Sequence, residues 1–149
     1  MKIVEASPAH AEVLARLHAE SFPEPWSLEA MAGALATPGA LGLVAQNRNN
    51  EPLGFLLVRS GGGEAEVLTI ATRPQARRSG VARALMDAGL ERVRAAGAET
   101  VFLEVAEDNV AAKAFYENVG FREVGRRKKY YARADGERID AVVMRLSFS

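Results

Sequence analysis

Two arginines and a small, flexible turn lie directly in front of an apolar helix pattern near the middle of the chain. The segment reads Arg77-Arg78-Ser79-Gly80-Val81-Ala82. Because the first N–H groups of a helix lack an intrahelical partner and lie at the positive end of its dipole, a phosphate can bind them. Gly80 lets the backbone approach a ligand closely. The segment therefore predicts an anion site, with an ordinary strand-to-helix connection and two solvated arginines as the alternative.

A single carboxylate interrupts the apolar run of residues 100–106. If this run is a strand, alternation places Glu104 on one face with Phe102 and Ala106. A buried acid is costly unless it is paired or useful in chemistry. The functional interpretation is a general base, and the structural one is an ion pair with a nearby arginine. Glu66, in the preceding predicted strand, competes for the same role.

The elements around these residues follow from periodicity and from turn residues. We expect a strand over 2–5, a helix from Ser7-Pro8 to about Ser21, and a second helix that Ser27 caps. Val13, Leu14 and Leu17 are expected to face inward. The two histidines, His10 and His18, are expected at the surface or half-buried, without a metal or catalytic role. Trp26 either fills the core between the two helices or lines a substrate entrance.

A change of period after residue 40 predicts strands. We expect an antiparallel hairpin of 41–46 and 53–60, and then a strand over 64–72. The next helix carries an inward stripe at helical spacing: Leu85, Ala88, Gly89, Arg92 and Val93. The strand of residues 100–106 follows, and a crossover of this length predicts parallel pairing of the fourth and fifth strands.

The last third of the chain is expected to hold one short helix and a closing hairpin. Asn109 begins the helix and Gly120 ends it; its apolar face is formed by Ala112, Phe115, Tyr116 and Val119. On this pattern alone Tyr116 is a core residue whose hydroxyl meets an acceptor. The hairpin strands are 121–131 and 138–146, joined around Ala134-Asp135-Gly136-Glu137.

Length and composition bound the class of protein. The chain has 149 residues, 48% of them apolar and 26% charged, which fits one domain over residues 1–149. Basic and acidic residues balance at 19 each, so no net field favours nucleic acid or a membrane surface. The absence of cysteine excludes disulfides and thiolate chemistry. No signal peptide or membrane span is recognisable, and a cytoplasmic protein without a metal is expected.

One basic run stands out against this neutral background: Arg126-Arg127-Lys128-Lys129-Tyr130-Tyr131. As structure, cations on an edge strand block unwanted strand pairing. As function, they meet the acidic surface of a protein substrate, or a phosphate backbone if that substrate is ribosomal. The two tyrosines are candidates for framing the first residues of a peptide.

Taken together, these features resemble the GNAT superfamily of acetyl-CoA-dependent N-acetyltransferases. The resemblance rests on the strand order and on three stretches: residues 77–82, the Asn109 start, and the block Ala114-Phe115-Tyr116-Glu117-Asn118-Val119-Gly120-Phe121. Segments 22–27, 102–109 and 126–131 are similar to the ribosomal-protein alanine N-acetyltransferases, which acetylate a protein's N-terminal amine. The resemblance implies a mixed α/β fold, with a mostly antiparallel sheet splayed between its fourth and fifth strands and flanked by helices.

The resemblance also implies roles for individual residues. A pyrophosphate loop would be formed by Arg77, Arg78, Ser79, Gly80, Val81, Ala82 and Arg83. The pantetheine arm of acetyl-CoA would pair with the backbone of Ile70, Ala71 and Thr72, and Asn109 would contact the same molecule. Glu104 matches the general base, and Tyr116 the general acid that protonates the departing thiolate. The chain departs from the pattern at Ala132 and near Ile139, so the substrate-side hairpin is expected to differ.

The expected function is transfer of an acetyl group from acetyl-CoA to the N-terminal amine of a protein or peptide, with a ribosomal protein as one candidate partner. Four residues are candidates for contact with that acceptor: Trp26, Glu66, Tyr130 and Tyr131. Direct binding of nucleic acid or membrane is not expected. Two alternatives stay open at this point, an acetyltransferase for a small amine or a lysine side chain and a non-catalytic acetyl-CoA-binding protein.

Overall fold

The computed structural model describes residues 1–133 and 135–148, so Ala134 of the predicted closing turn lies outside the described residues. The chain divides into two compact units, Met1–Ala98 and Glu99–Ser149. The single domain expected over residues 1–149 stays a prediction.

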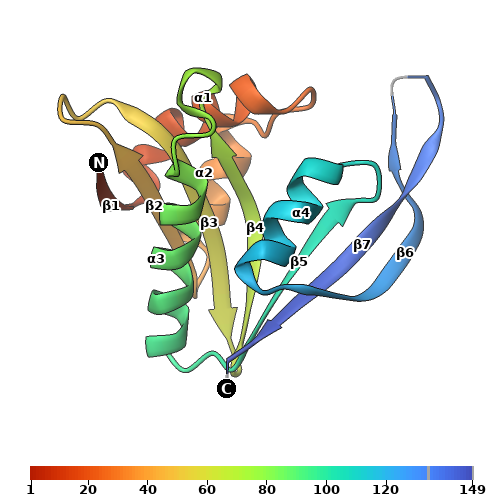
Figure 1. Ribbon diagram of the computed structural model, residues 1–149. Coiled ribbons are helices and arrows are strands. Elements are labelled where there is room, and N and C mark those ends of the chain that lie inside the picture. Colours follow the sequence, from red (N-terminus) through yellow and green to blue (C-terminus); the bar gives the residue numbers. More distant parts are fainter. Residues whose placement is uncertain (134, 149) are drawn as a thin grey trace. The chain divides into compact units, whose positions relative to one another are not determined.

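The first unit follows the predicted order of elements (Figure 1). Its strands are β1 (Lys2–Ala6), β2 (Ala40–Gln46), β3 (Pro52–Gly61) and β4 (Glu64–Thr72). Its helices are η1 (Pro8–His10), α1 (Ala11–Ser21), α2 (Leu28–Ala36), η2 (Pro74–Ala76) and α3 (Val81–Ala95). The Ser27 Oγ accepts a hydrogen bond from the Ala30 N–H at 3.0 Å, which confirms Ser27 as the cap of α2.

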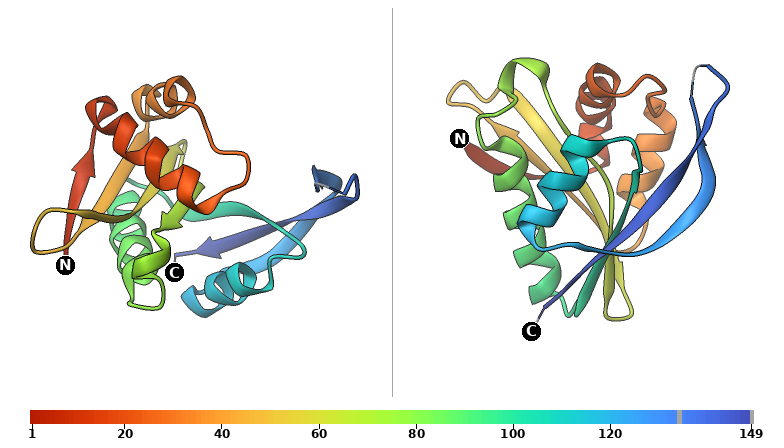
Figure 2. Two further views of the ribbon diagram at one scale, coloured as in Figure 1. Left: turned by 90° about the horizontal axis from the view of Figure 1, so that it is seen from above. Right: turned by 45° about the vertical axis from the view of Figure 1, so that its right-hand side comes forward.

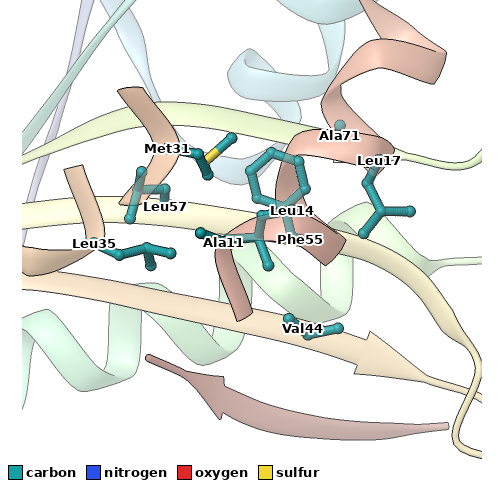
Figure 3. Packing of buried hydrophobic residues seen from close by; sticks show 9 residues of the cluster. All are labelled: Ala11, Leu14, Leu17, Met31, Leu35, Val44, Phe55, Leu57 and Ala71. Carbon is teal, nitrogen blue, oxygen red and sulfur yellow. The ribbon is translucent and has the colours of Figure 1, made fainter. Parts of the chain in front are cut away.

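Helices cover both faces of the first unit's antiparallel strands, which lie in the order β1-β2-β3-β4 (Figure 2). On one face, α1 and α2 pack on β3 through a cluster shown in Figure 3: Ala11, Leu14, Leu17, Met31, Leu35, Val44, Phe55, Leu57 and Ala71. On the other face lies α3, where a side chain at Gly89 would collide with Leu56. This close approach is possible only because the residue is glycine.

The predicted inward stripe of α3 is correct at Leu85, Gly89 and Val93 but wrong at Arg92. The Arg92 side chain is exposed and its Nη1 lies 3.5 Å from the Glu5 Oε2. Met86, which was not predicted to face inward, is fully buried. A long cationic side chain at the edge of an apolar helix face is easily solvated, whereas the Met86 thioether gains free energy from burial.

The second unit contains β5 (Thr100–Ala106), α4 (Val110–Val119), β6 (Arg122–Ala132) and β7 (Arg138–Ser147). Its strands lie in the order β5-β7-β6 and pair antiparallel. Alternation along β5 is as predicted, with Val101, Leu103 and Val105 buried. The parallel pairing and splay expected between the fourth and fifth strands concern the junction of the two units and stay predictions.

The closing hairpin, which was expected to differ in shape, contains a bulge in β6 whose position periodicity did not indicate. Arg127 lies opposite Ala141 and Tyr131 opposite Ile139, so four steps along β6 match two along β7. Lys129 adopts a φ of 53° in this bulge, and its N–H donates to the Asp140 Oδ1 at 2.9 Å. In a regular strand consecutive side chains point to opposite faces, whereas here the rings of Tyr130 and Tyr131 lie 5.2 Å apart.

His18 contradicts its predicted surface or half-buried position, because only 3% of the residue is exposed. Its Nδ1 accepts a hydrogen bond from the Trp26 N–H at 3.2 Å, and its ring stacks on Phe22 at 4.2 Å. The hydrogen bond requires an unprotonated Nδ1, and burial lowers the pKa of His18 below 6.5. Trp26 is half-buried against the α1–α2 cluster, which favours its predicted core role.

We predict that His18 makes the stability of the fold depend on pH. Because the folded pKa is depressed, the unfolded chain binds more protons, so this contribution is complete above about pH 6.5 and falls as the pH drops toward the folded pKa. In urea unfolding between about pH 5 and 7, His18→Asn keeps an acceptor for the Trp26 N–H and should flatten this dependence. His10→Asn changes an exposed histidine and serves as the control. Parallel curves for the parent and His18→Asn would contradict the assignment.

Candidate functional site

The predicted anion-binding segment has the backbone geometry that an anion needs. Gly80 stands immediately before α3 with a φ of 83°, a conformation that glycine adopts without strain. No side chain caps this end of α3, and its first turn contains no acidic residue. The first N–H groups of a 15-residue helix are therefore available to an anion.

The arginines of this segment differ in what they already bind. The Arg77 Nε donates to the Thr72 carbonyl at 3.3 Å, and the Arg83 Nε donates to the Asp87 Oδ1 at 3.0 Å. Within the described part of the chain Arg78 has no ion pair or hydrogen bond. Its φ of 63° lies in the left-handed region, which is uncommon for a residue with a side chain and marks the turn as constrained. Of the three arginines, Arg78 is the one without a partner among the described residues.

The predicted pantetheine segment forms the end of β4. Along β3, Leu56 lies opposite Ile70, Phe55 opposite Ala71, and Gly54 opposite Thr72. The register shifts between Leu57 and Val58, which leaves β4 with one extra residue before this segment. Next to the bulge, the Thr69 Oγ1 is buried and has no hydrogen-bond partner among the described residues. Sequence reasoning did not single out Thr69, since a threonine in a strand is ordinary.

Glu66 is paired within its own sheet. Its carboxylate accepts from the Arg59 Nη2 at 3.3 Å, across the β3–β4 pair. Both side chains are about half exposed, 51% for Arg59 and 43% for Glu66. An exposed cross-strand pair of this kind favours a structural interpretation of Glu66 over its use as a base.

The predicted base, Glu104, lies on β5 opposite Val143 and is 22% exposed. Its Oε1 forms an ion pair with the Arg127 Nε of β6, 2.9 Å away. The ion pair expected under the structural interpretation is therefore present. Because the carboxylate is still reached by solvent and the arginine is 57% exposed, the pair leaves the functional interpretation open.

Tyr116, on α4, is held among aromatic rings. The Phe115 ring lies 5.5 Å away and the buried Phe121 ring 6.0 Å away, both edge-on. Burial, and to a smaller extent the neighbouring Tyr131, raises the pKa of Tyr116 to about 12. The phenol is therefore protonated at neutral pH, as a hydrogen-bond donor must be.

Tyr131 links the two predicted catalytic groups. Its pKa is raised first by burial and then by the charge of Glu104, and it also contributes to the raised pKa of Tyr116. The second unit thus brings Glu104, Tyr116 and Tyr131 into one neighbourhood, with Tyr130 against Tyr131. Asn109 begins α4 as predicted, since its Oδ1 accepts from the Ala112 N–H at 3.2 Å.

The basic run is neutralised in part by the chain itself. Arg126 lies 2.8 Å from Glu107 and 3.4 Å from Glu123, and Arg127 pairs with Glu104. These pairs take the two arginines out of any general basic patch. Among the described residues Lys128 and Lys129 make no side-chain ion pair, so they remain the cations that a substrate or solvent can meet.

Two further observations concern a metal site and a membrane-spanning helix, neither of which was expected from the sequence. In residues 1–133 and 135–148 no group of three or more histidine, aspartate or glutamate side chains is arranged to hold a metal ion. None of the helices in these residues combines the length and the apolar character needed to cross a bilayer.

Comparisons with known proteins show the family of the chain. Residues 11–121 match the family model described as acetyltransferase (GNAT) family. The chain is 32% identical to the ribosomal protein bS18-alanine N-acetyltransferase of Escherichia coli K12 over 147 residues, which cover 91% of this chain and 97% of the relative. It is 36% identical over 143 residues to the N-alpha-acetyltransferase RimI of Mycobacterium tuberculosis, covering 92% and 86%.

The solved structures give the same result for the fold. The crystal structure of the ribosomal-protein-S18-alanine N-acetyltransferase from Escherichia coli matches with a TM-score of 0.92 and 28% identity, covering 99% of this chain and 94% of that one. The predicted mixed α/β fold class is thereby confirmed. The chain belongs to the GNAT acetyltransferase family, as its motifs indicated, and is an acetyl-CoA-dependent N-acetyltransferase.

Proposed function

We propose that this enzyme acetylates the N-terminal α-amino group of a protein. The observation that carries the proposal is the chain of contacts in the second unit from Glu104 through Arg127 and Tyr130 to Tyr131, with the protonated Tyr116 phenol held among aromatic rings in the same unit. It supplies a carboxylate for an amine proton and a phenol for a leaving group. The names of the relatives support the acceptor class, since the Escherichia coli protein acts on an alanine of ribosomal protein bS18. A ribosomal protein is accordingly the first acceptor to test.

An α-amino group suits a site with one modest base. With a pKa of ~7.7 to 8.0, roughly a tenth of it is neutral at pH 7, whereas a lysine amine of pKa ~10.4 is almost entirely charged. A larger fraction of an N-terminal amine is therefore already neutral and able to attack, and less deprotonation is required than for a lysine. This difference favours an N-terminal acceptor over a lysine side chain.

Glu104 is the proposed general base. As the amine nitrogen forms its bond to the acetyl carbon and the carbon–sulfur bond breaks, the nitrogen loses one proton, and the Glu104 carboxylate takes it directly or through a water molecule. Bound acetyl-CoA would supply the acetyl thioester for this reaction. No covalent bond to the protein is needed, so orientation of the two reactants accounts for much of the rate.

Tyr116 is the proposed partner of the departing sulfur. A phenol with a pKa of about 12 is a weaker acid than a thiol of ~8.5, so complete proton transfer to the thiolate is uphill. A hydrogen bond from the phenol to the developing negative charge is favourable at every stage. Hydrogen bonding therefore explains the role of Tyr116 better than full protonation of the leaving group.

The first unit supplies the proposed binding site for acetyl-CoA. The uncapped N-terminus of α3 and the unpaired Arg78 fit a pyrophosphate, because both offer donors and positive charge without a competing carboxylate. The rest of the segment from Arg77 to Arg83 would line the same anion. Ile70, Ala71 and Thr72 would hold the pantetheine arm, and the family resemblance assigns Asn109 a contact with acetyl-CoA.

Tyr130 and Tyr131 are proposed to frame the first residues of the acceptor. The bulge of β6 brings their rings edge to face instead of placing them on opposite faces. Tyr130 is 48% exposed, which leaves its ring accessible to a peptide. Trp26 stays a candidate for the acceptor entrance, although its packing against the α1–α2 cluster favours a core role.

The roles of base and donor can be tested by release of free CoA thiol with a panel of peptides. The panel contains alanine- and serine-initiated peptides and N-blocked peptides with an internal lysine. We expect turnover only with free N-termini, and a loss of about 10²-fold or more in kcat for Glu104→Gln because an amide cannot accept the proton. Tyr116→Phe should lower kcat less, by about tenfold, since one hydrogen bond is lost.

Glu66→Gln is the matched control, because it changes a carboxylate that is already paired across the strand. It should keep the parent rate within about twofold. Loss of activity in Glu66→Gln with none in Glu104→Gln would move the base to Glu66. Turnover confined to lysine would change the acceptor, and binding without turnover of any amine would remove the catalytic function.

The anion site makes a separate prediction about acetyl-CoA. Arg78→Gly removes the unpaired cation while suiting the φ of 63°, so the loop should keep its shape. We expect the KM for acetyl-CoA to rise about tenfold and the KM for the peptide to stay unchanged, as measured by initial rates. Arg16→Ala, which removes an exposed arginine paired with Glu12, is the control. An unchanged KM for acetyl-CoA in Arg78→Gly would exclude Arg78 from the pyrophosphate site.

A further inference from the structure

We propose that Arg127 occupies, in the free enzyme, the place on Glu104 that the ammonium group of the acceptor takes during the reaction. The inference rests on the proposed function and adds a residue to it. Arg127 would act as an exchangeable counter-ion of the base: it pairs with the carboxylate between turnovers, gives way to the N-terminal cation, and returns when the acetylated product is neutral.

The strand register gives Arg127 a direct path to the base. Glu104, Val143 and Gly125 lie opposite one another on β5, β7 and β6, so they share one face of the sheet. Arg127 is two residues beyond Gly125 on the same face. A Cβ at Gly125 would meet no atom within 4 Å, which leaves the surface beside Val143 open. The guanidinium therefore reaches diagonally across β7, and its Nε lies 2.9 Å from the Glu104 Oε1.

Arg127 already has a second contact, which it can keep when it leaves the carboxylate. The Arg127 guanidinium lies 5.2 Å from the centre of the Tyr130 ring. A cation over a tyrosine face is attracted by the ring, so the arginine has a partner after it leaves the carboxylate. Arg127 is 57% exposed, and the displaced guanidinium also regains water. An exposed ion pair of this kind is weak enough for a competing cation to replace it.

The exchange follows from a chemical difference between the two cations. A guanidinium does not give up its proton in proteins, whereas an α-ammonium with a pKa of ~7.7 to 8.0 does so readily. When the ammonium replaces Arg127, Glu104 holds a partner that can lose protons: the first leaves to solvent and gives the neutral amine, and the second passes to Glu104 as the nitrogen bonds to the acetyl carbon and the carbon–sulfur bond breaks. Acetylation then converts that partner into a neutral amide, which binds a carboxylate poorly in competition with a guanidinium. Arg127 consequently favours release of the product.

The test compares binding of two peptides to the parent and to Arg127→Met in the presence of CoA. One peptide is alanine-initiated with a free N-terminus, and the other is the same peptide N-acetylated. With the competitor removed, the free peptide should bind about fivefold more tightly, while the Kd of the acetylated peptide should not change. Arg127→Lys keeps a competing cation and should behave like the parent. Lys128→Met makes the same change of charge beside the site and should leave the ratio of the two Kd values unchanged.

Other results of these binding and activity measurements would contradict the inference. A lower kcat with an unchanged Kd for the free peptide in Arg127→Met would show that Arg127 only orients Glu104, and the inference would fall. An equal gain for both peptides would show an effect that does not depend on the ammonium, and the same gain in Lys128→Met would reduce the effect to general charge repulsion; either result would overturn the inference. Failure of the parent to acetylate any free N-terminus is a different result, because it removes the proposed function itself.

Discussion

A carboxylate that is mostly withdrawn from water needs a positive partner, and at Glu104 this requirement shapes the second unit. The acid lies on an apolar strand where Val101, Leu103 and Val105 are buried on the opposite face. Its counter-charge comes from β6, two strands away, and Gly125 leaves the intervening surface free for the arginine. By our proposal an incoming ammonium replaces this pairing, so the contact that neutralises the carboxylate in the free enzyme is the one that the acceptor takes over.

Under the proposed function, each unit supplies a different set of chemical groups. The first offers backbone N–H groups and an unpaired arginine at the start of α3, which is what an anion requires. The second offers a carboxylate, a protonated phenol and two tyrosine rings, which is what an amine and a leaving group require. Neither set needs a metal ion or a cysteine, in keeping with a direct transfer between two bound reactants.

The errors made from the sequence share one physical origin. The spacing of residues along the chain predicts a helix or a strand, but it does not show which distant residue a side chain will contact. The helix boundaries and strands were predictable because capping residues and periodicity act locally, as at Ser27 and Gly80. His18 was misplaced because its burial depends on Phe22 and on a hydrogen bond from Trp26. The prediction for Arg92 was wrong because helical spacing does not show that Glu5, on β1, lies within reach of the Arg92 guanidinium.

By itself the sequence determined the order of the elements, the glycine turn before α3, and the motifs that make an acetyltransferase of the GNAT family recognisable. These features are short motifs or local periodicities, so they can be recognised without knowledge of distant contacts. Only the tertiary structure decided that the β6 bulge brings two tyrosines together, that Glu66 is paired with Arg59, and that Arg127 meets Glu104. Each of these depends on strand register, and register joins residues that are far apart in the chain.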